Sequence, residues 1–95
     1  EYGIFAVILN ISSKNKRIIG RPRFISRGFI YMKGSRELLQ EIENLVMDIH
    51  RDWLNKSHRE KMFKDEELRE KIEKELSKLI YKRTEREPII LTAII

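Results

Sequence analysis

The sequence predicts an α+β domain, with a β-sheet layer packed by two helices on at least one side. Apolar runs rich in β-branched residues lie at 3–11 and 89–95, as expected for strands. Two longer segments between these runs carry apolar residues at helical spacing, and Gly, Pro and polar clusters separate the segments. The predicted order is strand, strand, irregular extended segment, helix, helix, strand.

The first predicted strand is the run 3–11, which is too short for a buried helix and is followed by a polar turn at 12–16. Extended structure resumes at 17–19 and suggests a hairpin. Apolar residues occupy both alternating sets of positions in 3–11 and again in 89–95. We therefore expect both faces of the sheet to be covered, one of them by something outside the chain, and the last strand to be central.

The segment 24–32 is predicted to be extended or partly extended, with Gly28 at a bend or bulge. A first helix is expected over 36–56, after the favourable N-cap Ser35. A second helix is expected to begin after the N-cap candidate Asp65 and to end before Pro88. The apolar stripes that predict these helices are Leu38, Leu39, Ile42, Leu45, Val46, Ile49 and Trp53, and then Leu68, Ile72, Leu76, Leu79 and Ile80.

Charge is segregated along this chain of 95 residues, whose formal net charge is +5. Residues 1–36 contain eight Lys or Arg and a single acid, Glu1, whereas the rest has a small acidic excess. A one-sided cationic field attracts phosphate backbones. Basic loops that serve only solubility, or that pair with a neighbouring domain, are the competing interpretations. The candidate RNA-phosphate contacts are Lys14, Lys16, Arg17, Arg21, Arg23, Arg27, Lys33 and Arg36.

The composition excludes several classes of function. The chain has no cysteine, so it has no disulfide framework and no thiolate zinc site. No apolar run approaches the ~20 residues that span a bilayer. Acids and bases mixed on both predicted helices disfavour a membrane-surface role. We expect a cytoplasmic protein with no membrane partner.

No catalytic constellation is visible in the sequence. On one continuous helix His50 and His58 would stand about 12 Å apart and point in different directions, so they cannot share a metal. A surface or boundary position is expected for both histidines. The carboxylates stand beside Lys and Arg at helical spacing, which is the pattern of solvated ion pairs. We therefore expect no catalytic residue, no metal ligand and no cofactor in this chain.

The segment Arg27-Gly28-Phe29-Ile30-Tyr31 partly resembles the core of an RNA-recognition-motif strand, in which aromatic rings stack on bases. Ile30 replaces the expected small residue, and two consecutive helices do not match that fold. Phe29 and Tyr31 would share one face of a strand, where a role as core aromatics is the simpler interpretation.

Two segments resemble the C-terminal domain of ribonuclease J. The first is Arg21-Pro22, followed by Ile25-Ser26-Arg27-Gly28-Phe29-Ile30-Tyr31 and by Ser35 at the start of a helix. The second is the segment 79–91. In this segment a helix ends with Tyr81 and Thr84 and is followed by Arg86, Pro88 and an apolar strand. The motif and docking residues are Ser26, Arg27, Gly28, Phe29, Tyr31, Tyr81, Arg86 and Pro88. The chain departs from the family pattern at Arg23, Gly34, Glu87 and Thr92. Proline is frequent in the family at the position of Thr92.

The resemblance implies a small three-stranded, mixed sheet faced by two helices. It also implies a parent enzyme whose metallo-β-lactamase and β-CASP domains hold two zinc ions and cleave RNA, as an endonuclease and as a 5′–3′ exonuclease. The C-terminal domain of such an enzyme is non-catalytic and supports assembly into dimers or tetramers.

We therefore expect residues 1–95 to form a single accessory domain cut from such an enzyme. Its expected partners are the catalytic domains of the parent chain and further copies of the same chain, and zinc belongs to the parent. Direct binding of single-stranded RNA by the basic N-terminal region is the alternative.

Overall fold

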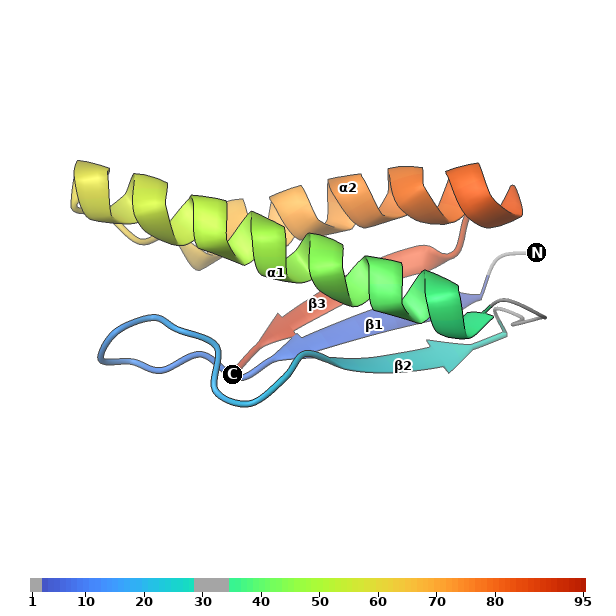
Figure 1. Cartoon of the computed structure of the whole chain (residues 1–95), viewed down its shortest axis with the longest axis horizontal. Coiled ribbons are helices and arrows are strands. Elements are labelled where there is room, and N and C mark those ends of the chain that lie inside the picture. Colours follow the sequence, from blue (N-terminus) through green and yellow to red (C-terminus); the bar gives the residue numbers. More distant parts are fainter. Residues whose placement is uncertain (1–2, 29–34) are drawn as a thin grey trace.

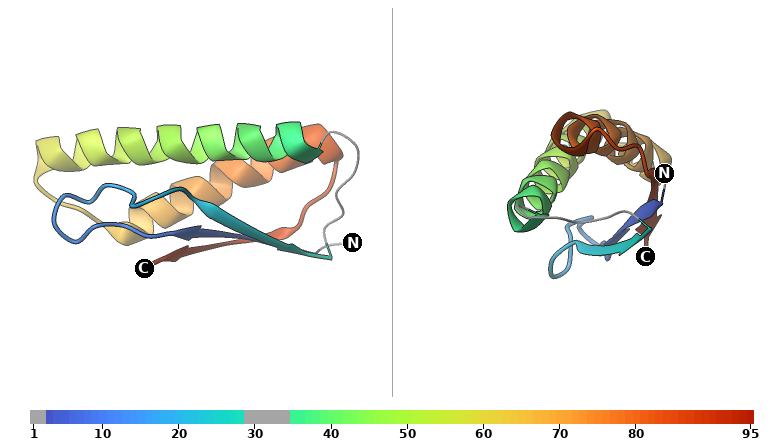
Figure 2. Two further views of the ribbon diagram at one scale, coloured as in Figure 1. Left: turned by 60° about the horizontal axis from the view of Figure 1, so that its bottom comes forward. Right: turned by 90° about the vertical axis from the view of Figure 1, so that its right-hand side faces the viewer.

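The computed structural model describes residues 3–28 and 35–95 and shows a small sheet with two long helices along one of its faces (Figures 1 and 2). The elements are β1 (Ile4–Leu9), β2 (Arg23–Arg27), α1 (Ser35–Glu60), α2 (Asp65–Thr84) and β3 (Ile89–Ile94). The predicted α+β class, the three-stranded mixed sheet and the order of strands and helices are confirmed.

The sheet has the strand order β2-β1-β3, with β1 antiparallel to β2 and parallel to β3. Parallel strands need a long crossover connection, and the pair of helices lies in the connection that returns the chain to β3. The central strand is therefore β1, and the prediction that the last strand is central was wrong. The apolar residues of β3 lie on both of its faces because one face packs on the helices and the other is exposed.

The second strand is also displaced from its predicted place. It lies at Arg23–Arg27 and so overlaps the segment 24–32, which was expected to be extended or partly extended, whereas residues 17–19 contribute an isolated bridge between Ile11 and Ile18. Gly20, with φ of +75°, and the buried Pro22 separate this bridge from β2. The remainder of the predicted extended segment, residues 29–32, lies outside the described residues.

The core lies between the inner face of the sheet and the two helices. Phe5, Val7 and Leu9 on β1 alternate with outward-facing residues, as the two-residue period of a strand requires. The buried positions of the helices follow the predicted stripes: Ile42, Val46, Ile49 and Trp53 on α1, and Leu68, Ile72, Leu76 and Ile80 on α2. Ile90 on β3 belongs to the same core, and Ile11, Ile18 and Phe63, which lie outside the strands and helices, pack against it.

The helix ends differ from prediction by a few residues. α1 continues to Glu60, and the chain then reverses at Lys61, whose φ is +55°. Asp65 is the first residue of α2 and not its N-cap; that position belongs to Lys64, which makes no side-chain capping bond. Asp65 still places a carboxylate at the positive end of the helix dipole. The side chain of Ser35, the predicted N-cap of α1, lies outside what the structure describes.

Candidate assembly surface

The face of the sheet opposite the helices is open to solvent (Figure 2). Paired residues on neighbouring strands point to the same side of a sheet, so the register defines this face. Ala6 pairs with Ile25 on β2 and with Leu91 on β3. We call the following nine residues the outer sheet face: Ile4, Ala6, Ile8, Arg23, Ile25, Arg27, Ile89, Leu91 and Ala93.

The outer sheet face is aliphatic apart from its two arginines. Ile4, Ile25, Leu91 and Ile89 are exposed to 39, 45, 49 and 55%. Exposed aliphatic residues on most proteins are scattered singly, whereas those of this face form a contiguous patch over three strands. Sequence reasoning expected something outside the chain to cover one face of the sheet. The structure shows which residues form the exposed face of the sheet.

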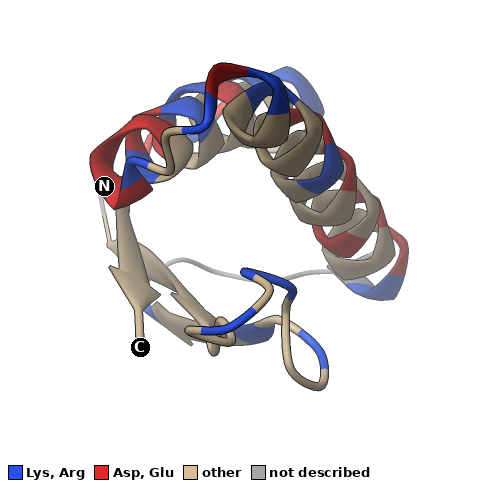
Figure 3. Cartoon of the chain, turned by 90° about the vertical axis from the view of Figure 1, so that its left-hand side faces the viewer, with Lys and Arg blue, Asp and Glu red and all other residues tan. Residues whose placement is uncertain are grey.

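The acids and the sheet lie in different layers of the molecule. The described segments 3–28 and 89–95 contain no Asp or Glu, whereas residues 36–87 hold acids and bases in nearly equal number. Figure 3 shows acids on the helices and the segments next to them, and none on the strands. The sheet layer is therefore cationic, and the helix layer is close to neutral.

Two bidentate ion pairs connect α1 to other elements. Arg21, in the loop before β2, donates to both carboxylate oxygens of Glu43, at 2.9 and 2.8 Å. Arg83 on α2 makes the same kind of pair with Glu41. The hydrogen bond from each arginine lowers the pKa of its glutamate. Arg21 is thus used to attach the loop to the helix.

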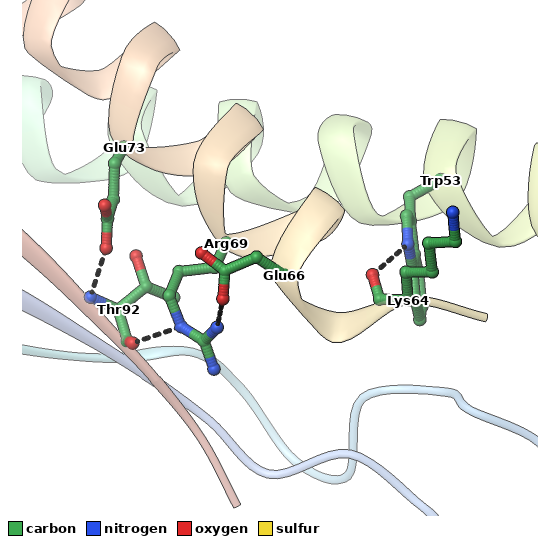
Figure 4. Close-up of polar contacts among 6 residues, drawn as sticks. All are labelled: Trp53, Lys64, Glu66, Arg69, Glu73 and Thr92. Carbon is green, nitrogen blue, oxygen red and sulfur yellow. Dashed lines mark hydrogen bonds and ion pairs between the residues drawn. The ribbon is translucent and has the colours of Figure 1, made fainter.

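A polar contact closes the free edge of β3 (Figure 4). The amide groups of Ile89 and Ile95 donate to carbonyls on the β1 side, so alternation directs the Thr92 amide away from β1. Glu73 on α2 accepts from that amide at 3.0 Å, and Arg69 donates to the Thr92 carbonyl at 3.2 Å. We call Arg69 and Glu73 the edge clasp. A proline at position 92 would have no amide proton to donate to Glu73.

His50 attaches the loop between β1 and β2 to α1. It is only 6% exposed, and its Nε2 donates to the carbonyl of Lys16 at 2.8 Å. The expected surface or boundary position of this histidine was wrong, because the loop folds over the helix at this point. His58 is exposed, as expected. No group of three or more His, Asp or Glu that could hold a metal occurs in the described part of the chain.

The predicted RNA-phosphate contacts occupy several parts of the fold. Lys14, Lys16 and Arg17 lie on the loop between β1 and β2, and Arg23 and Arg27 lie on the outer sheet face. The other three candidates are Arg21, paired with Glu43, Arg36, in the first turn of α1, and Lys33, which lies outside the described residues.

The motif residues near the end of α2 form the end of that helix. Glu85 has a left-handed φ of +59°, and its amide donates to the carbonyl of Tyr81 at 2.8 Å. Thr84 Oγ1 donates to the carbonyl of Ile80 and accepts from the amide of Arg86. Pro88 is buried at the entry to β3. This motif therefore stops α2 and directs the chain into the sheet.

The motif residues around β2 lie at the opposite edge of the sheet from β3. Ser26 and Arg27 are the last two residues of β2, and Gly28 follows with φ of +67°. Phe29 and Tyr31 lie outside the described residues. Tyr81, from the other motif, is 50% exposed on α2.

Fold and surface together describe a two-layer domain of two helices on a three-stranded sheet, whose outer sheet face is exposed and largely aliphatic. The chain belongs to the ribonuclease J C-terminal domain family, whose model matches residues 1–95. It is 36% identical over 94 residues to ribonuclease J 2 of Staphylococcus epidermidis and 35% identical to ribonuclease J 2 of Staphylococcus aureus. These matches cover 99% of the chain but only 16% of either relative.

No helix in residues 3–28 and 35–95 is long and apolar enough to cross a membrane. The described residues also do not fit the zinc chemistry that the resemblance assigns to a parent enzyme, since they hold no cluster of metal-ligating side chains.

Proposed function

We propose that this chain is a non-catalytic accessory domain of a zinc-dependent ribonuclease and that it supports assembly by binding a second copy of itself. The observation that carries the proposal is the outer sheet face. Exposed aliphatic side chains from all three strands form one surface that the described part of the chain leaves uncovered. Burial of such surface contributes about 25 cal/mol per Å², which favours contact with another apolar surface.

The chemistry of the outer sheet face favours a protein partner over RNA. Proteins that bind single-stranded nucleic acid stack bases on aromatic rings, and no aromatic side chain belongs to the nine residues of this face. Phe5 and Phe24 stack on each other, at 5.6 Å between ring centres, and Phe5 is buried in the core. Among the described strand residues, the aromatic rings therefore lie on the inner face of the sheet and not on the outer sheet face.

The alternative, direct RNA binding, rests on the cationic loop. Lys14, Lys16 and Arg17 lie in a sheet layer without acids, so they can approach phosphates. Anisotropy of labelled single-stranded RNA titrated with the chain separates the alternatives. Binding that persists at physiological salt would favour RNA contact, and binding that is lost there would leave only a non-specific electrostatic attraction.

The assembly proposal is tested with two matched substitutions. Leu91 on the outer sheet face and Leu39 on α1 are exposed to 49 and 42%, so Leu91→Asp and Leu39→Asp change the same residue type at similar exposure. Light scattering should show the wild-type chain associating at concentrations up to about 1 mM, where a contact worth only about 4 kcal/mol is populated. Leu91→Asp should weaken association at least about tenfold, since each 1.4 kcal/mol is a factor of ten, and Leu39→Asp should leave it unchanged.

A milder variant guards against loss of folding. Leu91→Thr retains a residue that favours strands and removes most of the apolar surface, so it should weaken association in the same direction. Circular dichroism checks that each variant is folded. Equal association of the two aspartate variants, or a wild-type chain that stays monomeric throughout, would contradict the proposal.

A further inference from the structure

Two basic turns lie at the same end of the molecule. The loop between β1 and β2 belongs to the sheet layer and the connection from α1 to α2 to the helix layer, yet both lie at the end where α1 finishes (Figures 1 and 2). Segment 12–17 contributes three Lys or Arg, and segment 58–64 contributes three more and a single acid, Glu60. Figure 3 looks onto this end of the molecule. We call these six cations the basic end: Lys14, Lys16, Arg17, Arg59, Lys61 and Lys64.

The described part of the chain does not neutralise the basic end. None of the six cations forms an ion pair with a described residue, whereas Asp52, Glu66 and Glu67 each pair with a basic residue outside the basic end. Glu60 and Asp65 remain, so six cations stand against two carboxylates in this region. The two shorter dimensions of the domain are 21 and 18 Å, so the basic end is one compact surface. Clustered cations of this kind attract a chain of phosphates.

Both turns of the basic end are attached to the body of the fold. Nε2 of the buried His50 donates to the carbonyl of Lys16 at 2.8 Å, which holds the loop against α1. Nε1 of the buried Trp53 donates to the carbonyl of Lys64 at 3.1 Å, which holds the connection against the same helix. These bonds use backbone carbonyls and leave the lysine side chains available. A surface that is already ordered loses less entropy when a ligand binds.

An exposed ring lies among these cations. His58 is exposed, and its ring meets Phe63 edge to face at 5.1 Å between ring centres. Phe63 is half-buried and meets the buried Trp53 edge to face at 5.9 Å, so the exposed ring is supported from below. Proteins that bind single-stranded nucleic acid combine cations along the backbone with rings on which bases stack, and histidine is one of the rings used. The basic end has such a ring, whereas the outer sheet face has none.

We propose that the basic end binds single-stranded RNA, with backbone phosphates on its cations and one base stacked on His58. The chain belongs to a ribonuclease family, so RNA is the polynucleotide considered. The inference goes beyond the assembly function and uses a different surface, so each stands or falls without the other. It also revises the candidates predicted from the sequence, because Lys14, Lys16 and Arg17 are joined here by three cations from the helix connection. Phosphate contacts carry no sequence information, so the binding is sequence-tolerant.

Anisotropy of a labelled polyuridylate of about 12 nucleotides, a length that a single small domain covers, tests the site. The wild-type chain should bind it saturably, and binding should remain measurable at about 0.15 M salt. The double variant Lys14→Gln with Lys61→Gln removes one cation from each turn and should weaken binding at least about tenfold. The slope of log affinity against log salt should fall by about 1.4, since each phosphate contact of a single strand contributes about 0.7. Lys74→Gln with Lys82→Gln removes two exposed, unpaired lysines of α2 with the same change in net charge and should leave the affinity unchanged.

The ring is tested separately with His58→Ala. This variant should bind the polyuridylate at least about fivefold more weakly, since a base that stacks on a ring loses that contact. Duplex RNA of the same length keeps its bases paired, so the wild-type chain and His58→Ala should bind it equally. Circular dichroism checks that every variant is folded.

Three results would overturn the proposal. If the two double variants weakened binding equally, the attraction would belong to the net charge of the whole chain and not to the basic end. If His58→Ala bound the polyuridylate as the wild-type chain does, the basic end would be a plain cationic surface that suits an acidic protein equally well. Absence of saturable binding at about 0.15 M salt would exclude the site altogether. None of these results bears on assembly, which light scattering measures without RNA.

Discussion

At the scale of single residues, His50 connects the basic loop to the helix layer. Burial lowers the pKa of His50 below its ordinary value of 6.5, and the charge of Arg17 acts in the same direction, while the hydrogen bond to Lys16 opposes both. The folded state therefore favours the neutral imidazole. A carbonyl can only accept, so Nε2 carries the proton in this form.

This burial predicts a stability that depends on pH. Because the pKa of His50 is lower in the folded state, its contribution is complete above 6.5 and is lost as pH falls below that value, where the unfolded chain binds the proton first. Urea unfolding at about pH 7.5 and about pH 5.5 should show a lower free energy of unfolding at the acidic value.

The variant His50→Gln isolates this effect, since glutamine retains an N–H donor and does not titrate. Its free energy of unfolding should change less between the two pH values than that of the wild-type chain. His58→Gln removes the exposed histidine and serves as the matched control, with the wild-type pH dependence retained. If His50→Gln kept the full dependence, other groups would be responsible for it.

The position of His50 also shows a limit of sequence reasoning. Helical periodicity placed Ile49 and Trp53 in the core correctly, because those residues belong to a local repeating pattern. His50 is buried by a loop that lies 34 positions earlier in the chain. No local pattern contains that contact, and the same holds for the Glu73 and Arg69 contacts with Thr92.

At the scale of elements, two glycines allow the start of β1 to approach the end of β2. Gly3 has φ of +74°, and a Cβ there would lie 2.6 Å from the backbone of Gly28. Gly20 also has a positive φ, +75°, but a Cβ there meets nothing within 4 Å. Gly20 therefore tests the conformational strain of a positive φ alone, whereas Gly3 tests the same strain together with a steric contact.

Substitution of these glycines should have unequal effects. Gly20→Ala should cost about 1–2 kcal/mol in free energy of unfolding, from the left-handed backbone alone. Gly3→Ala adds overpacking against backbone, which typically costs a further 1–3 kcal/mol. Urea denaturation measures both values. Equal costs would show that the close approach of Gly3 and Gly28 is not maintained.

The helices were located more accurately than the second strand, whose residues were predicted only to be extended or partly extended, and the reason is physical. Helical periodicity over many residues located α1 and α2 to within a few residues, whereas β2 is five residues long and carries two arginines and a serine. Its identity as a strand depends on pairing with β1, a contact between distant segments. The hairpin strand was predicted at 17–19 because Ile18 and Ile19 are apolar, but that segment forms only an isolated bridge.

At the scale of the whole molecule, the helix layer holds the mixed charges, and the described sheet layer holds basic residues and no acid around an aliphatic face. Sequence analysis identified the charge segregation and the apolar residues on both sides of the strands. It did not identify the outer sheet face as one surface, because that depends on the register of three strands. Sequence analysis likewise could not identify the pairing of Arg21 with Glu43, because these residues are 22 positions apart in the chain.

The central claim is that the outer sheet face associates through apolar contact, and sedimentation equilibrium of the wild-type chain at low salt and at about 0.5 M salt tests it most directly. Salt screens the repulsion between cationic sheet layers and does not weaken apolar contact. The account predicts association that is retained or strengthened at high salt. Association that disappears at high salt, or a chain that remains monomeric in both conditions, would contradict it.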